Sequence, residues 1–163
     1  MKKGLILSIL LIPALVLFAC GNDSKTYAGV ELSTSDYSNV TKFEEEARNL
    51  YSLLDTFSIE KDDVDSVNKI VDSASELQGT LGKGMSKDEK KESNLLFYTN
   101  VSVASIPKNA VKYSREISNT EYQLINSSIK EVIQREAKKV TDNQNDADKI
   151  NDYLIEKIGI TED

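Results

Sequence analysis

The sequence has no histidine, and it has one cysteine among 163 residues. Without histidine the chain cannot form a histidine-dependent catalytic triad or use a histidine as a general base, and it lacks the commonest transition-metal ligand. A single cysteine excludes disulfides within the chain, so the fold must be stabilised by packing. We therefore predict no catalytic residue, no cofactor and no metal site, and we expect that the protein is not an enzyme.

Basic residues are outnumbered by acidic ones. The chain has 20 lysines and arginines against 27 aspartates and glutamates, which gives a formal net charge of −7. An acidic chain repels the phosphates of nucleic acids, and it lacks the clustered lysine and arginine side chains that such a partner requires. We therefore expect no nucleic-acid partner. The acidity instead favours solubility and the attraction of basic partners.

A long apolar run lies at the N-terminus. Met1, Lys2 and Lys3 precede an apolar segment over residues 4–18, which is shorter than the roughly 20 apolar residues that a transmembrane helix needs. A basic start, a short apolar middle and a small residue at the end are the parts of an export signal. We expect residues 1–19 to be a signal peptide that is removed.

The single cysteine lies where this apolar run meets polar sequence. Leu17-Phe18-Ala19-Cys20 resembles the lipobox of bacterial lipoproteins, with Phe18 larger than the residue usual at its place. The resemblance implies that the sulfur of Cys20 receives a diacylglyceryl group and that a signal peptidase cuts between Ala19 and Cys20. Two acyl chains, such as palmitate, anchor a protein stably, since each buried CH₂ contributes about 0.8 kcal/mol. The alternative is an unmodified thiol, in an uncleaved anchor or just past an ordinary cleavage site.

The resemblance also implies a location. A lipoprotein of this kind is held at the cell membrane or the outer membrane and faces outside the cytoplasm. In bacteria with two membranes, Asp after the lipidated cysteine tends to retain lipoproteins at the inner membrane, so Gly21 would imply export to the outer one. The sequence leaves open whether the host has one membrane or two.

Residues 20–40 have no sustained apolar period and are rich in Ser, Thr, Asn, Asp and Gly. This composition predicts that the lipidated Cys20 is followed by a flexible tether, with a short strand near residues 29–32 as the alternative. Residues 41–163 are of the length of one ordinary domain. We expect a single domain there.

Apolar residues at steps of three and four predict amphipathic helices throughout this domain. The clearest helix is expected to begin at Thr41, because Glu44 completes a capping box with it. Residues 94–106 suit either a strand or a helix ended by Pro107, and we favour a helix because no partner strand of similar quality exists. A shorter helix is expected over residues 108–117. The fold class predicted is all-α, a bundle of five or six amphipathic helices behind a flexible N-terminal tether.

Three motifs that could carry chemistry are interpreted as structural. Residues 79–86 lack the spacing of a phosphate-binding loop and indicate a helix stop at Gly82 and Gly84. Residues 142–148 lack the Gly and Glu of a calcium loop and indicate an interhelical loop with Asn145 or Asp146 as cap. Serine and lysine also occur at the spacing of serine enzymes that act on peptidoglycan, without those enzymes' companion motifs. The four pairs are Ser58/Lys61, Ser66/Lys69, Ser105/Lys108 and Ser127/Lys130.

The seven tyrosines divide by their position relative to the apolar faces. Tyrosines off those faces are candidates for a protein interface, and those near them are expected in the core. The first group is Tyr27, Tyr37 and Tyr113, and the second is Tyr51, Tyr98, Tyr122 and Tyr153.

Two functions follow from these observations. We expect a lipid-anchored, non-enzymatic protein that binds another protein, in immunity or exclusion, in adhesion, or as an accessory part of the envelope. The alternative is a small envelope ligand-binding protein or a carboxylate-dependent enzyme, with Glu44, Glu45 or Asp63 at a cleft. A large apolar pocket with convergent carboxylates would favour the alternative, and a solid core would favour protein binding.

Overall fold

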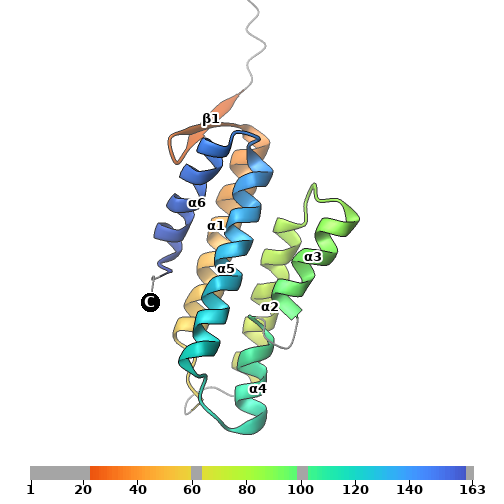
Figure 1. Cartoon of the computed structure of the whole chain (residues 1–163), viewed down its shortest axis with the longest axis vertical. Coiled ribbons are helices and arrows are strands. Elements are labelled where there is room, and N and C mark those ends of the chain that lie inside the picture. Colours follow the sequence, from red (N-terminus) through yellow and green to blue (C-terminus); the bar gives the residue numbers. More distant parts are fainter. Residues whose placement is uncertain (1–22, 60–63, 99–102, 161–163) are drawn as a thin grey trace, which may run out of the picture.

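The computed structural model describes residues 23–59, 64–98 and 103–160. In these residues six helices follow one two-stranded antiparallel sheet (Figure 1). The predicted all-α bundle is confirmed. The expected signal peptide, residues 1–19, and Cys20 with Gly21 lie outside the described residues.

The two strands form a β-hairpin. β1 (Ser24–Tyr27) pairs with β2 (Val30–Ser33), and Ala28 and Gly29 connect them. Both connecting residues have positive φ, 53° and 76°. Two consecutive residues of this conformation form the turn whose twist matches that of the flanking strands.

One face of this hairpin is part of the core. The side chains of Tyr27, Val30 and Leu32 are buried, because alternate residues of a strand point to the same side. The flexible tether predicted over residues 20–40 is therefore wrong from Ser24 onward. The alternative of a strand near residues 29–32 is confirmed.

α1 (Thr34–Asp55) begins at Thr34 rather than at Thr41. The cap is Ser33, whose Oγ accepts a hydrogen bond of 3.1 Å from the backbone N–H of Asp36. Thr41 lies inside the helix, where its hydroxyl donates to the backbone carbonyl of Tyr37 at 2.8 Å. The predicted start was wrong because the end of the hairpin supplies an earlier cap, so the helix begins before Thr41 and also buries Val40.

The remaining helices complete the bundle. They are α2 (Val64–Leu81), α3 (Lys87–Tyr98), α4 (Ser105–Tyr113), α5 (Asn119–Val140) and α6 (Gln144–Ile158). α1, α5 and α6 lie side by side beneath the hairpin, and α2 packs on α1 with α3 and α4 beyond it (Figure 1). We call the end that carries β1 and β2 the hairpin end, and the end where α1 stops and α5 starts the far end.

The segment around Pro107 differs from the prediction. Within residues 94–106, α3 continues to Tyr98 as the favoured helix, residues 99–102 lie outside the described part, and α4 begins at Ser105. Pro107 does not stop a helix. It lies in the first turn of α4, where its missing N–H would have no partner within the helix in any case. The helix predicted over residues 108–117 therefore starts and ends earlier than expected.

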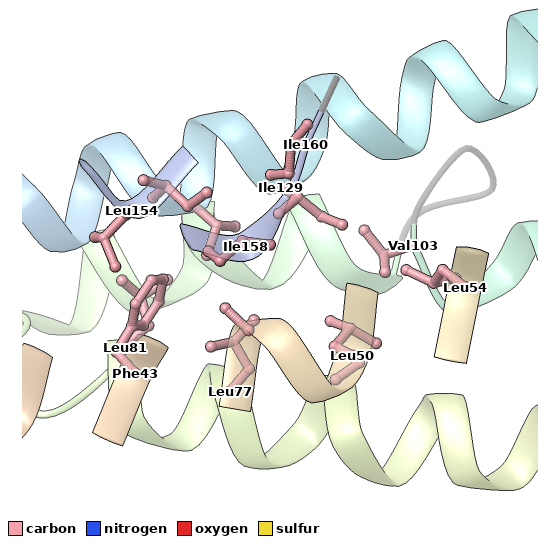
Figure 2. Packing of buried hydrophobic residues seen from close by; sticks show 14 of the residues in the cluster. Phe43, Leu50, Leu54, Leu77, Leu81, Val103, Ile129, Leu154, Ile158 and Ile160 are labelled. Carbon is pink, nitrogen blue, oxygen red and sulfur yellow. The ribbon is translucent and has the colours of Figure 1, made fainter. Parts of the chain in front are cut away.

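The core runs along the whole bundle. Figure 2 shows it extending from Phe43 and Leu81, past Leu77, to Leu50 and Leu54. The largest fully buried side chains come from five of the helices: Phe43, Leu50, Ile70, Leu77, Leu81, Ile106, Ile125, Ile129, Ile133, Ile150 and Leu154. Packing of this extent explains how a chain without disulfides holds its fold.

Candidate functional site

One candidate site is a groove at the far end, open to solvent, between the last turns of α1 and the first turns of α5. Its volume is about 410 Å³. We call it the tyrosine groove. Its lining residues are Tyr51, Leu54, Asp55, Asn119, Tyr122, Gln123, Ile125 and Asn126.

Helical spacing brings these side chains together. Tyr51 and Asp55 are four residues apart on α1, and Asn119, Tyr122 and Asn126 are three and four apart on α5, so each set lies along one face of its helix. Two further lining residues, Leu54 and Ile125, are buried. They give the groove an apolar floor beneath polar walls.

The start of α5 is held firmly. Ser118 caps the helix, and its Oγ accepts a hydrogen bond from the backbone N–H of Glu121 while the Glu121 carboxylate accepts one from the backbone N–H of Ser118. Arg115 donates two further hydrogen bonds, of 2.8 and 2.6 Å, to the same carboxylate. These bonds lower the pKa of Glu121 to about 2. The α5 wall of the groove is therefore fixed at its beginning.

The charged groups near the Tyr122 end of the groove are carboxylates. Burial raises the pKa of Tyr122, and the charges of Glu116 and Asp55 raise it further. Neither carboxylate belongs to an ion pair among the described residues, and the nearby cation of Arg115 is already bound by Glu121. The phenol thus lies next to two uncompensated negative charges.

A second groove, about 720 Å³ in volume, lies between α1 and α2. Its walls are polar and carry charges of both signs. Lys42 and Glu46 form an ion pair of 3.4 Å there, and Asn49 donates a hydrogen bond of 3.1 Å to the hydroxyl of Ser73 nearby. The lining residues are Lys42, Glu45, Glu46, Asn49, Glu76, Gly79, Thr80 and Lys83.

The carboxylates proposed for a cleft do not converge. Glu44 accepts a hydrogen bond of 2.7 Å from the Tyr27 hydroxyl and lies 3.7 Å from the guanidinium of Arg48. Glu45 is exposed and lines the second groove instead. Asp63 lies outside the described residues.

Tyr27 is buried, and its predicted exposure is wrong. Its ring packs edge-on against Tyr153 at 5.2 Å and against Tyr37 at 6.2 Å between centroids. Burial and the hydrogen bond to Glu44 raise the pKa of its phenol. The sequence misled because the residue precedes the helices and its strand was not expected.

Tyr37, also predicted to lie off the apolar faces, is half-buried against the core, whereas Tyr113 agrees with the prediction. Tyr113 is exposed, with 62% of its surface accessible. Tyr51, Tyr122 and Tyr153, which were expected in the core, are half-buried and pack against it. The side chain of Tyr98 lies outside the described part of the structure.

A buried carboxylate on α5 was missed by the sequence analysis. Glu136 has no exposed surface, and its Oε2 lies 2.5 Å from the Nζ of Lys139. The same Nζ donates hydrogen bonds of 3.2 Å to the backbone carbonyls of Thr80 and Leu81, at the end of α2. The signal was present: Glu136 follows Val132 at a step of four, on the buried face of α5.

The surroundings of Glu136 raise its pKa. Burial raises the pKa of the Glu136 carboxyl, and the cation of Lys139 lowers it. The charges of Asp36 and Glu46 on α1 raise it as well, so the pKa remains above its ordinary value. This cluster ties α5 to the free carbonyls of α2, which a lysine can satisfy. We interpret it as structural.

The Ser-x-x-Lys pairs are distributed over the molecule. Ser66/Lys69, Ser105/Lys108 and Ser127/Lys130 lie on three different helices, and Lys61 of the fourth pair lies outside the described residues. Each of the three described pairs therefore lies on a helix of its own.

The two loops act as helix ends. Gly84 has a φ of 78°, and Ser86 and Glu89 form a reciprocal capping box at the start of α3. α6 is capped by Asn143, whose Oδ1 accepts a hydrogen bond from the backbone N–H of Asp146, so the predicted caps Asn145 and Asp146 are wrong. Among the residues that the structure describes, no group of three or more acidic or cysteine side chains could hold a metal ion.

Comparisons with known proteins found no match: no family model, no curated protein and no solved structure resembles this chain significantly. Within the described ranges, none of the helices combines the length and the apolar character needed to cross a membrane.

Proposed function

We propose that this protein is a lipoprotein of the bacterial cell envelope, anchored outside the cytoplasmic membrane by fatty acyl chains on Cys20, and that it acts by binding another protein. The observation that carries the proposal is the lipobox-like Leu17-Phe18-Ala19-Cys20 in front of a helical body. The first strand of that body begins at Ser24. An export signal, an acylated cysteine and a water-facing domain then follow in the order that a lipoprotein requires.

Surface features support binding rather than catalysis. The grooves described above are open and lined mainly by residues with polar side chains, and neither gathers Glu44 together with Glu45. Three large apolar side chains are exposed in the described part of the chain, Val64, Tyr113 and Leu124. Exposed apolar side chains beside polar ones are typical of surfaces that bind proteins.

The anchor is tested by metabolic labelling with an alkyne analogue of palmitate. We expect label on the wild-type chain and none on Cys20→Ala or Cys20→Ser, because either substitution removes the sulfur that carries the lipid. Mass spectrometry of the native chain should find an acylated Cys20 at the N-terminus. A native chain that starts at Met1, or one with a bare thiol, would contradict the anchor.

The binding role is tested on intact cells. Chemical cross-linking of a tagged full-length chain, followed by purification and mass spectrometry, should yield the same protein partner in repeated experiments. The Cys20→Ala chain serves as the control, since we expect its release from the membrane to reduce that yield. A chain that never gives a protein adduct would argue against this role.

A further inference from the structure

The tyrosine groove lies at the end of the bundle away from the N-terminus. The described chain begins at the hairpin end, and the groove is formed where α1 stops (Figure 1). α1 has 22 residues, so about 33 Å separates its two ends at 1.5 Å per residue. In a chain anchored near the hairpin, this groove faces away from the lipid.

The exposed apolar side chains gather at the same end. Val64 is the first residue of α2, Tyr113 the last of α4, and Leu124 lies in the second turn of α5. Their exposed fractions are 63%, 62% and 38%. α2 starts, α4 ends and α5 starts at the far end (Figure 1). The far end therefore carries exposed apolar side chains in addition to the groove.

The charge of the groove selects the partner. Asp55 lines it, and Glu116 lies close enough to influence Tyr122, yet neither has an ion-pair partner among the described residues. Arg115, the neighbouring cation, is engaged by Glu121. A cation brought into the groove by another molecule would meet the Asp55 carboxylate and two tyrosine side chains, with the charge of Glu116 nearby.

We propose that the tyrosine groove is a docking site for a protein partner that inserts an arginine side chain. The guanidinium pairs with the Asp55 carboxylate and packs against the rings of Tyr51 and Tyr122, while apolar residues of the partner contact Tyr113. Arginine fits better than lysine because its planar head both stacks on aromatic rings and pairs with a carboxylate. Arginine and tyrosine are also the residues on which interfaces depend most. This inference rests on the proposed protein-binding function.

The test uses a photoreactive residue in the full-length chain in cells. Benzoylphenylalanine replaces Gln123, an exposed residue of the groove, and in a matched variant it replaces Asn145, an exposed residue at the hairpin end. Irradiation should give a protein adduct from position 123 and not from position 145. Peptide mapping should place the attachment next to an arginine of the partner.

A second substitution tests the charge. Asp55→Asn should lower the adduct yield by about threefold, as loss of a solvent-accessible ion pair would. Asp72→Asn removes an exposed carboxylate on α2 that belongs to none of the described ion pairs, and it should leave the yield unchanged. Thermal unfolding should show that both variants remain folded.

Any result that differs from these expectations overturns the inference. No adduct at position 123, an adduct with lipid or with a second copy of this chain, or a yield insensitive to Asp55→Asn would exclude this docking site. An adduct from position 145 alone would overturn the site while leaving the proposed protein-binding function in place. Failure of the binding function itself is detected separately, by the cross-linking of the whole chain described above.

Discussion

The two ends of the bundle use the same kinds of residue differently. At the hairpin end, the hydroxyl of Tyr27 donates to Glu44, and Lys139 compensates the buried Glu136. At the far end, Tyr122 is half-buried beside Asp55, a carboxylate without an ion pair among the described residues. Polar groups paired within the fold hold it together, whereas carboxylates without an ion pair at the surface are available to another molecule.

The largest effect should come from breaking the buried pair at the hairpin end. Lys139→Met leaves the Glu136 carboxyl buried without its cation and removes two hydrogen bonds to α2. We expect the free energy of unfolding to fall by about 3 kcal/mol at pH 7. Urea denaturation measures this. Lys138→Met, at the exposed neighbouring position, should change stability by less than about 0.5 kcal/mol.

The pH dependence of this variant sharpens the prediction. The pKa of Glu136 is raised in the folded protein, so the folded state binds more protons than the unfolded one and stability falls as pH rises above the unfolded pKa. Without Lys139 the pKa should rise further. The loss caused by Lys139→Met should therefore be smaller at pH 5 than at pH 7, and an equal loss at both would contradict the assignment.

A smaller effect is expected where the hairpin meets α1. Tyr27→Phe keeps the ring but removes the hydrogen bond to the Glu44 carboxylate, at a cost of about 1.5 kcal/mol. Tyr37→Phe is the matched control, because its hydroxyl makes no hydrogen bond among the described residues. Denaturant midpoints of the two variants should differ. Equal midpoints would show that the Tyr27 hydroxyl contributes nothing.

At the far end, the cap of α5 should contribute less to stability than the Tyr27 hydrogen bond does. Glu121→Gln removes the charge bound by Arg115, and we expect a loss below about 1 kcal/mol, because solvent screens the pair. The pKa of Glu121 is lowered to about 2, so its contribution is present above pH 4.5 and is lost as pH falls toward 2. Wild type and variant should converge over that range. A difference that persists at pH 2 would refute the ionic contribution.

The smallest effect on stability should come from the exposed apolar residues. Tyr113→Ser should change the free energy of unfolding by less than about 0.5 kcal/mol, because 62% of its surface is already accessible. Its effect should appear instead in the adduct yield from position 123. Thermal unfolding that drops by many degrees would show that Tyr113 belongs to the fold rather than to an interface.

The helices were predictable because periodicity is a local signal. Phe43, Leu50 and Leu54 recur along one face, and all three are buried. The hairpin was harder, since its turn is Ala28-Gly29 rather than a stronger turn sequence. Its burial also depends on helices that follow it in the chain, so composition alone suggested a tether.

The groove could not be predicted from the sequence. Tyr51 and Tyr122 were each expected in the core, and each is instead half-buried at its edge. Their meeting depends on α1 and α5 being neighbours, which are separated by three helices in the chain. Periodicity finds the face of one helix, but it does not say which helices share a groove.

The start of β1 at Ser24 limits how far an anchored molecule can extend. With the lipid on Cys20, as proposed, four residue steps reach at most about 14 Å. The hairpin end of the domain would then stay close to the bilayer. The far end would lie within roughly 50 Å of the membrane surface, which is the reach of the linker plus the length of α1. A partner held in the same membrane would meet it by two-dimensional diffusion at a high local concentration, so a complex would form at lower affinity than it would in solution.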